Sequence, residues 1–231
     1  MFGHGDDAQA VISSVVAQLC EDEFKDRIRF TGPAKFSQKT TANIIEVILP
    51  ITDRILRPMG RSEQSFKVSV ANLEAASMMD VGSNIYGHSA GVPIFLALWS
   101  ARLQIPIADD IVSTGHIASI DGDIRMIKGM PAKLSAAATD DSIGTFIHPA
   151  LDQDNSLQVL SPNEKKRIAD ALIKMKHRLK MIPVRDISDL VRVVFKDEQI
   201  VSASLKQGYY KVPASLDVEE TLINKTGSYF V

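Results

Sequence analysis

The chain has 231 residues, of which 45% are hydrophobic and 23% charged, and this suits a globular protein large enough to bury a core without disulfides. A single cysteine, Cys20, excludes an intrachain disulfide framework and a cysteine-based zinc cluster. The formal net charge of −2 gives no overall electrostatic footprint for nucleic acid, and no apolar stretch approaches the ~20 residues of a membrane span. The acidic first residues lack the basic and apolar regions of a secretory signal, so we expect a cytoplasmic protein.

The first 71 residues are expected to form two helices and two strands. Residues 6–28 place apolar side chains at roughly helical spacing and predict an N-terminal helix. Residues 27–32 alternate polar and apolar side chains and stop at a Gly-Pro pair, which is typical of a strand. A long helix is predicted over 37–56, with Pro50 kinking it or ending its first half. Residues 66–71 alternate again and predict a second strand.

The rest of the chain alternates strands with helices. An apolar helix should begin at residues 89–91, because Pro93 is tolerated only near a first turn, and end near residue 103. The capping box of Ser161 and Glu164 marks the start of a later helix. No clear element is visible over residues 200–231. The other predicted elements are strands over 111–114, 117–120, 124–127, 144–148 and 180–184, and helices over 131–138, 164–179 and 188–195. Hairpins mixed with crossover helices favour an α+β fold.

Ser89 is the first residue whose setting points to chemistry. Residues 86–91 read Tyr-Gly-His-Ser-Ala-Gly, so the serine lies between small residues at a loop-to-helix junction. Its hydroxyl should be accessible, and the free amides of a helix start could stabilise an oxyanion. Taken alone, this segment is better explained by an ordinary N-cap serine.

Lys133 is the second such residue. It falls in the first turn of the helix predicted over 131–138, where the helix dipole disfavours an ammonium group. Its apolar neighbours add desolvation, and both effects should lower the pKa of the lysine. A neutral lysine can take a proton from a serine, although a solvated surface lysine is the commoner case.

The histidines and charge runs indicate no better site. A triad of Ser89, His116 and an aspartate remains open, but no spacing selects the acid. His88 and His116 would need a third ligand to bind zinc, and none is signalled, so we expect no metal and no cofactor. The sequence contains no Gly-x-x-x-x-Gly-Lys-[Ser/Thr] motif of a P-loop ATPase. Both histidines are expected to titrate near ~6.5.

Taken in order, these segments resemble the proteolytic domain of Lon proteases. Residues 86–91 are similar to that family's Asp-Gly-Pro-Ser-Ala-Gly motif, which places the nucleophile at Ser89. Residues 114–116, Thr-Gly-His, are similar to its Thr-Gly-Glu strand end. Residues 129–137 are similar to Gly-x-Lys-Glu-Lys-x-x-Ala-Ala, whose second lysine falls on Lys133. The resemblance covers about residues 27–195, and the ordered set of motifs is specific although each motif alone is not.

The chain departs from the family pattern around both residues. Tyr86 stands where the family has aspartate, His88 where it has proline and His116 where it has glutamate. The first lysine and the glutamate of the lysine motif are Pro131 and Ala132. The nucleophile and the catalytic lysine are both retained.

The resemblance implies an α+β proteolytic domain over residues 27–197, with the two-layer arrangement of ribosomal protein S5 domain 2. Residues 1–26 would be an N-terminal helical extension. Residues 198–231 would be a C-terminal extension, either a strap packed on the domain or a tail that blocks the groove beside Ser89.

The implied function is a serine endopeptidase, ATP-independent in itself, that cleaves unfolded or flexible polypeptides with Ser89 as nucleophile and Lys133 as general base. Thr114 would orient the lysine, and His116, His88 and Tyr86 would support the site. A separate AAA+ unfoldase and further copies of the chain, hexameric in the resembled family, are the expected partners. The alternative is an inactive Lon-like scaffold or assembly module, whereas a nucleic-acid-binding module is disfavoured by the net charge of −2.

Overall fold

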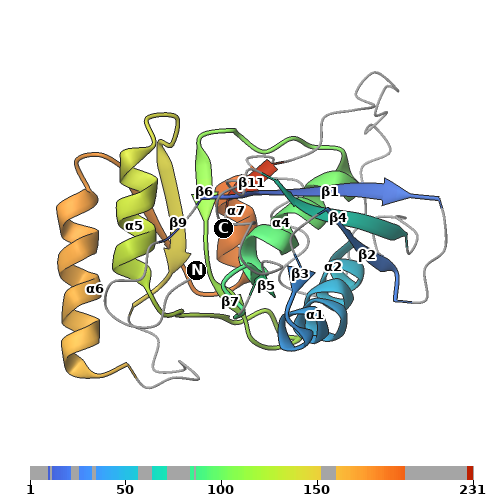
Figure 1. The fold of residues 1–231 in the computed structure, drawn as a ribbon, viewed down its shortest axis with the longest axis horizontal. Coiled ribbons are helices and arrows are strands. Elements are labelled where there is room, and N and C mark those ends of the chain that lie inside the picture. Colours follow the sequence, from blue (N-terminus) through green and yellow to red (C-terminus); the bar gives the residue numbers. More distant parts are fainter. Residues whose placement is uncertain are drawn as a thin grey trace.

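The computed structural model describes residues 10, 12–21, 26–32, 35–56, 64–71, 84–85, 87–151, 160–195 and 228–230. Its elements in chain order are β1 (Ser14–Cys20), β2 (Ile28–Thr31), β3 (Lys35–Phe36), α1 (Gln38–Asn43), a π-helical segment η1 (Ile44–Ile48), α2 (Leu49–Leu56), β4 (Ser65–Ala71), β5 (Asn84–Ile85), α4 (Gly91–Leu103), β6 (Ile111–Ser113), β7 (His116–Ile117), β8 (Ile124–Arg125), α5 (Met130–Thr139), β9 (Thr145–Pro149), α6 (Pro162–Met175), β10 (Lys180–Val184), α7 (Ile187–Val194) and β11 (Ser228–Phe230) (Figure 1).

A mixed sheet of seven strands forms the centre, in the order β10-β9-β6-β11-β1-β4-β2. The strands β10, β9, β6 and β11 run parallel to one another, and β1 is antiparallel to both β11 and β4. A short antiparallel hairpin of β7 and β8 follows β6. Parallel and antiparallel pairing together with crossover helices gives a mixed α and β architecture, as the order of predicted elements indicated.

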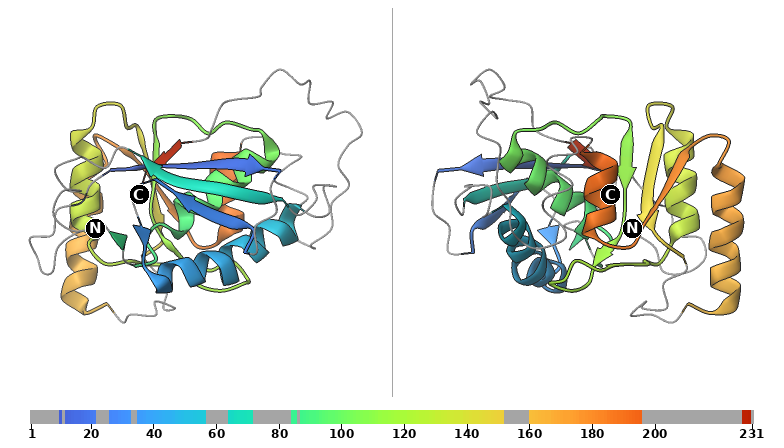
Figure 2. Two further views of the ribbon diagram at one scale, coloured as in Figure 1. Left: turned by 45° about the vertical axis from the view of Figure 1, so that its right-hand side comes forward. Right: turned by 180° about the vertical axis from the view of Figure 1, so that it is seen from behind.

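Both faces of the parallel part of the sheet are buried. Along β6 and β9, Ile111 and Ile147 contribute to a core that includes α4 and α7, while Val112 and Phe146 contribute to a second core with α5 and α6. This alternation follows from the two-residue period of a strand. Figure 2 shows α5 and α6 side by side at one end of the molecule. The two cores therefore lie on opposite faces of the strands that carry the candidate site.

The helix α4 begins and ends where the sequence predicts. It runs from Gly91, and Pro93 is its third residue, where the missing N–H costs no intrahelical hydrogen bond. Twelve of its thirteen residues are buried, which explains why its sequence is apolar all round. It ends at Leu103, and the next residue, Gln104, takes the left-handed conformation with φ of 59°.

The prediction of a helix over residues 6–28 is wrong for Ser14–Cys20, which form the strand β1. The apolar residues Val11, Val15 and Leu19 lie four positions apart in the sequence. This spacing would place them on one side of a helix, and it would equally place them on one face of a strand. Pairing with β4 along all seven residues and burial of Val15 and Ala17 decide in favour of the strand. Most of the proposed N-terminal extension lies outside the described residues.

The other predicted elements are largely confirmed. The long helix over 37–56 is present as α1, η1 and α2, and the change back to α-helix begins at Leu49, directly before Pro50. The capping box of Ser161 and Glu164 forms as expected, and α6 ends at Met175. The C-terminal segment, for which no element was predicted, supplies β11 between β1 and β6.

Candidate active site

Ser89 lies in the short turn that leads into α4, and the end of β6 holds this turn. The carbonyl oxygen of Ser89 accepts hydrogen bonds from the N–H of Gly115 at 3.1 Å and from the hydroxyl of Thr114 at 3.3 Å. The Gly91 N–H donates to the His88 carbonyl at 3.0 Å, which closes the turn. The backbone around the serine is thus held both by the turn itself and by residues 114–115, which are distant in the chain.

Polar side chains of α1 bind the backbone of this turn and of β7. The hydroxyl of Thr40 donates to the carbonyl of Gly87 at 3.0 Å, and the side-chain amide of Asn43 donates to the carbonyl of Ile117 at 3.2 Å. Gly87 has a φ of +88°, which favours glycine at this position. Neither Thr40 nor Asn43 was among the predicted site residues, because a polar residue on a helix carries no local signal of a distant partner.

Lys133 is the fourth residue of α5 and is only 7% exposed. Its Nζ lies 3.5 Å from the Oγ of Ser89, so the structure brings together the two residues that the sequence selected. Burial lowers the pKa of Lys133 from 10.5 to about 8. The direction agrees with the prediction, and desolvation is the cause that the structure supports.

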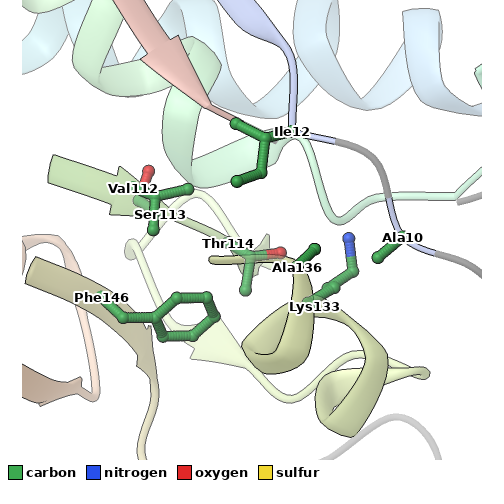
Figure 3. Close-up of a pocket in the computed structure, with 8 residues that line it drawn as sticks. All are labelled: Ala10, Ile12, Val112, Ser113, Thr114, Lys133, Ala136 and Phe146. Carbon is green, nitrogen blue, oxygen red and sulfur yellow. The ribbon is translucent and has the colours of Figure 1, made fainter. Parts of the chain in front are cut away.

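The amine of Lys133 borders a small cavity of about 10 Å³, whose lining includes Ala10, Ile12, Thr114 and Phe146. Figure 3 shows the side chains of Thr114 and Lys133 on neighbouring elements at this cavity. The hydrogen bond of this hydroxyl nevertheless goes to the Ser89 carbonyl, so Thr114 orients the serine turn directly. The position of Ala10 and Ile12 beside the lysine was not foreseen.

The rings of His88 and His116 stack beside the serine, with centroids 4.4 Å apart and planes inclined by 19°. Burial, followed by the nearby His88 and Arg125, lowers the pKa of His116 to about 4. Burial and then Lys39 lower the pKa of His88 as well. The expected titration of His116 near ~6.5 is therefore wrong, because a half-buried ring between other cationic groups resists protonation.

Tyr86 lies outside the described residues. His148, on β9, has its Nδ1 2.9 Å from the Pro149 carbonyl oxygen. Within the described ranges, no group of three or more His, Cys, Asp or Glu side chains could hold a metal ion. The arrangement is that of a hydroxyl nucleophile beside a lysine with a lowered pKa, which suits acyl transfer.

Comparison with known proteins identifies the family that the chain resembles. Residues 83–197 match the family described as the Lon protease (S16) C-terminal proteolytic domain, so the resemblance seen in the sequence is confirmed. The chain is also similar to the archaeal Lon protease of Pyrococcus abyssi (strain GE5 / Orsay), with 23% identity over 181 residues. This match covers 78% of the chain and 16% of the relative, so the chain spans about a sixth of that protein's length. None of the helices in the described ranges has both the length and the apolar character needed to cross a membrane.

Proposed function

We propose that this chain, whose residues 83–197 belong to the Lon protease family, is a serine endopeptidase that cleaves unfolded or flexible polypeptides with Ser89 and Lys133. The observation that carries the proposal is the distance of 3.5 Å between Ser89 Oγ and the Nζ of a buried lysine. This distance is long for a hydrogen bond, but such catalytic contacts are often loose without substrate.

The lowered pKa of Lys133 makes the lysine a usable base. With a pKa of about 8 the amine is neutral in about one molecule in ten at pH 7, against about one in three thousand for a pKa of 10.5. The neutral amine takes the Ser89 proton while Oγ bonds to the peptide carbonyl carbon. The resulting ammonium returns the proton to the leaving nitrogen as the C–N bond breaks, and water then releases the acyl group in the same way.

The turn before α4 would also stabilise the oxyanion. The N–H groups of Gly91 and Val92 already donate to the carbonyls of His88 and Gly115. We therefore assign the oxyanion hole to the preceding amides of Ser89 and Ala90, which lie at the positive end of the α4 dipole. Thr114 and Gly115 contribute by fixing the carbonyl of Ser89.

The finer features of the proposal rest on the family. The 231 residues contain no P-loop motif, so the domain would act without ATP itself and would receive polypeptides that are already unfolded or are delivered by a separate AAA+ unfoldase. We also propose self-association, hexameric by family resemblance, a cytoplasmic location and the two-layer arrangement of ribosomal protein S5 domain 2. The limits 27–197 for the proteolytic domain belong to the same proposal.

Casein cleavage tests the dyad. The variants Ser89→Ala and Lys133→Ala should each lose activity while keeping the wild-type circular dichroism spectrum, because both residues act as one unit. Lys133→Arg should also be inactive, since a guanidinium does not give up its proton near neutral pH. Ser142→Ala and Lys128→Ala, at exposed positions outside the site, are matched controls that should cleave normally.

Labelling with an active-site serine probe separates the peptidase from the alternative of an inactive scaffold. A peptidase should be labelled at Ser89, with labelling abolished in Lys133→Ala. A folded chain that neither reacts with the probe nor cleaves casein would favour the scaffold. Full cleavage by Lys133→Ala would exclude the lysine as base.

A further inference from the structure

The stacked rings of His88 and His116 connect the nucleophile with two cationic side chains. His88 directly precedes Ser89, and its ring lies against that of His116. On the other side, His116 pairs with Arg125 in the register of the β7–β8 hairpin. Lys39 precedes Thr40, whose hydroxyl binds the carbonyl of Gly87 next to His88. Arg125 and Lys39 thus approach the stack from two different elements.

The positive charge here is not balanced by neighbouring acids. Lys39 and Arg125 are the cations that oppose protonation of His88 and His116, and no carboxylate of the described residues acts on either ring. Within the same ranges, neither Lys39 nor Arg125 forms a salt bridge. The Nε of Arg125 is buried without a hydrogen-bond partner. Asp123, two residues before Arg125, instead accepts a hydrogen bond from Ser119.

Because the stacked histidines are uncharged, Arg125 and Lys39 supply the positive charge that a bound polypeptide would meet beside the stack. Because burial keeps His116 uncharged at neutral pH, its ring does not add a third charge to the site. The stacked rings add apolar surface near both cations, and charges beside such a surface are screened less than in water. An acidic side chain of a substrate would meet two unpaired cations there, whereas a basic side chain would be repelled.

Resting on the proposed peptidase function, we propose that Arg125 and Lys39 select polypeptides that carry an acidic side chain close to the scissile bond. Arg125 and Lys39 act on the His88–His116 ring stack, and His88 directly precedes the nucleophile Ser89. An extended substrate advances about 3.3 Å per residue. The two cations should therefore reach side chains roughly two or three residues from the cleaved bond. The substrate class is therefore an unfolded segment with aspartate or glutamate next to the cleavage point.

Matched peptides test this selectivity. A set of fluorogenic peptides would be identical except for Glu, Gln or Lys at each of the three positions on either side of the cleaved bond, and kcat/KM would be measured for each. At one position kcat/KM for the Glu peptide should exceed that for the Gln peptide by about two- to fivefold, the range expected for a partly exposed charge pair. Lys should be the poorest at that position, and the preference should shrink in high salt.

Variants connect the preference to the two cations. Arg125→Gln and Lys39→Gln should each bring the ratio of kcat/KM for the Glu peptide to that for the Gln peptide toward one, because the Glu peptide loses its cationic partner. Arg125→Glu should favour the Lys peptide. Lys128→Gln, an exposed lysine in the turn before α5, is the control and should retain the preference. If Arg125→Gln does not fold, the variant Lys39→Gln, at an exposed position, still provides the test.

The outcomes also separate this proposal from the peptidase itself. Equal kcat/KM for Glu and Gln peptides at every position, or a preference unchanged in both Gln variants, would overturn the selectivity and leave the peptidase standing. If no peptide is cleaved, anisotropy of labelled peptides on Ser89→Ala decides. Tighter binding of the Glu peptide that is lost in Arg125→Gln would support the cationic site, and equal binding would refute it.

Discussion

Replacing Lys133 by methionine should stabilise the protein near neutral pH while abolishing catalysis. Holding an ammonium group whose pKa is lowered from 10.5 to about 8 costs the folded state about 3 kcal/mol at pH 7. Methionine is similar in length, carries no charge, and suits surroundings that include Val112, Ala136 and Phe146. The variant avoids this cost and should resist denaturation better than the wild type.

The pH dependence makes the test independent of small packing differences. Between pH 8 and 10.5 the unfolded chain keeps the Lys133 proton and the folded chain has lost it, so wild-type stability rises with pH. The cost of the ammonium falls from about 3 kcal/mol at pH 7 to about 1 kcal/mol at pH 10. The advantage of Lys133→Met should therefore shrink by about 2 kcal/mol over this range.

Urea unfolding of both proteins at pH 7 and pH 10 measures this difference directly. Lys128→Met is the control, because it makes the same replacement at an exposed position. An advantage of Lys133→Met that stays constant with pH would refute the reasoning, since the ammonium would then cost the folded protein nothing. Such a result would also remove the physical basis for a neutral lysine base.

Four further outcomes are expected. Casein cleavage should rise about tenfold from pH 7 to pH 9 as Lys133 loses its proton, and a flat profile would argue against a lysine base. His116→Phe, which keeps a ring in the stack but binds no proton, should lose less stability than the wild type as pH falls from 6.5 to about 4 in acid titrations followed by circular dichroism. Gly115→Ala should lower kcat and destabilise the fold by about 1–3 kcal/mol. The added Cβ would lie 2.8 Å from Val92 Cγ2 and would displace the Gly115 N–H that donates to the Ser89 carbonyl. Unchanged kinetics of casein cleavage would contradict this role of Gly115. Truncation after Asp197 removes β11 from between β1 and β6 and should lower the melting temperature, whereas faster casein cleavage at unchanged stability would show instead that the tail blocks the site.

Signals confined to a few neighbouring residues were read correctly from the sequence. Pro93 places the start of α4, and the capping box of Ser161 places that of α6, because each depends on contacts within a single helical turn. The same reasoning failed at Ser14–Cys20, whose apolar spacing fits two periodicities. Pairing with β4, about fifty residues further along the chain, resolves this ambiguity. No local pattern could reveal β11, whose three residues gain their structure from β1 and β6.

In the candidate site, too, some features follow from local sequence and others depend on the tertiary structure. By itself the sequence determined that a serine stands at the start of one helix and a lysine in the first turn of another, since helix starts carry local marks. Only the tertiary structure decided that Ser89 and Lys133 meet at 3.5 Å, that Thr114 and Gly115 hold the serine carbonyl, and that His116 stays neutral. The physical reason is that a distance between side chains and the desolvation that lowers a pKa depend on every element packed around a group, and residues 44 positions apart share no local pattern.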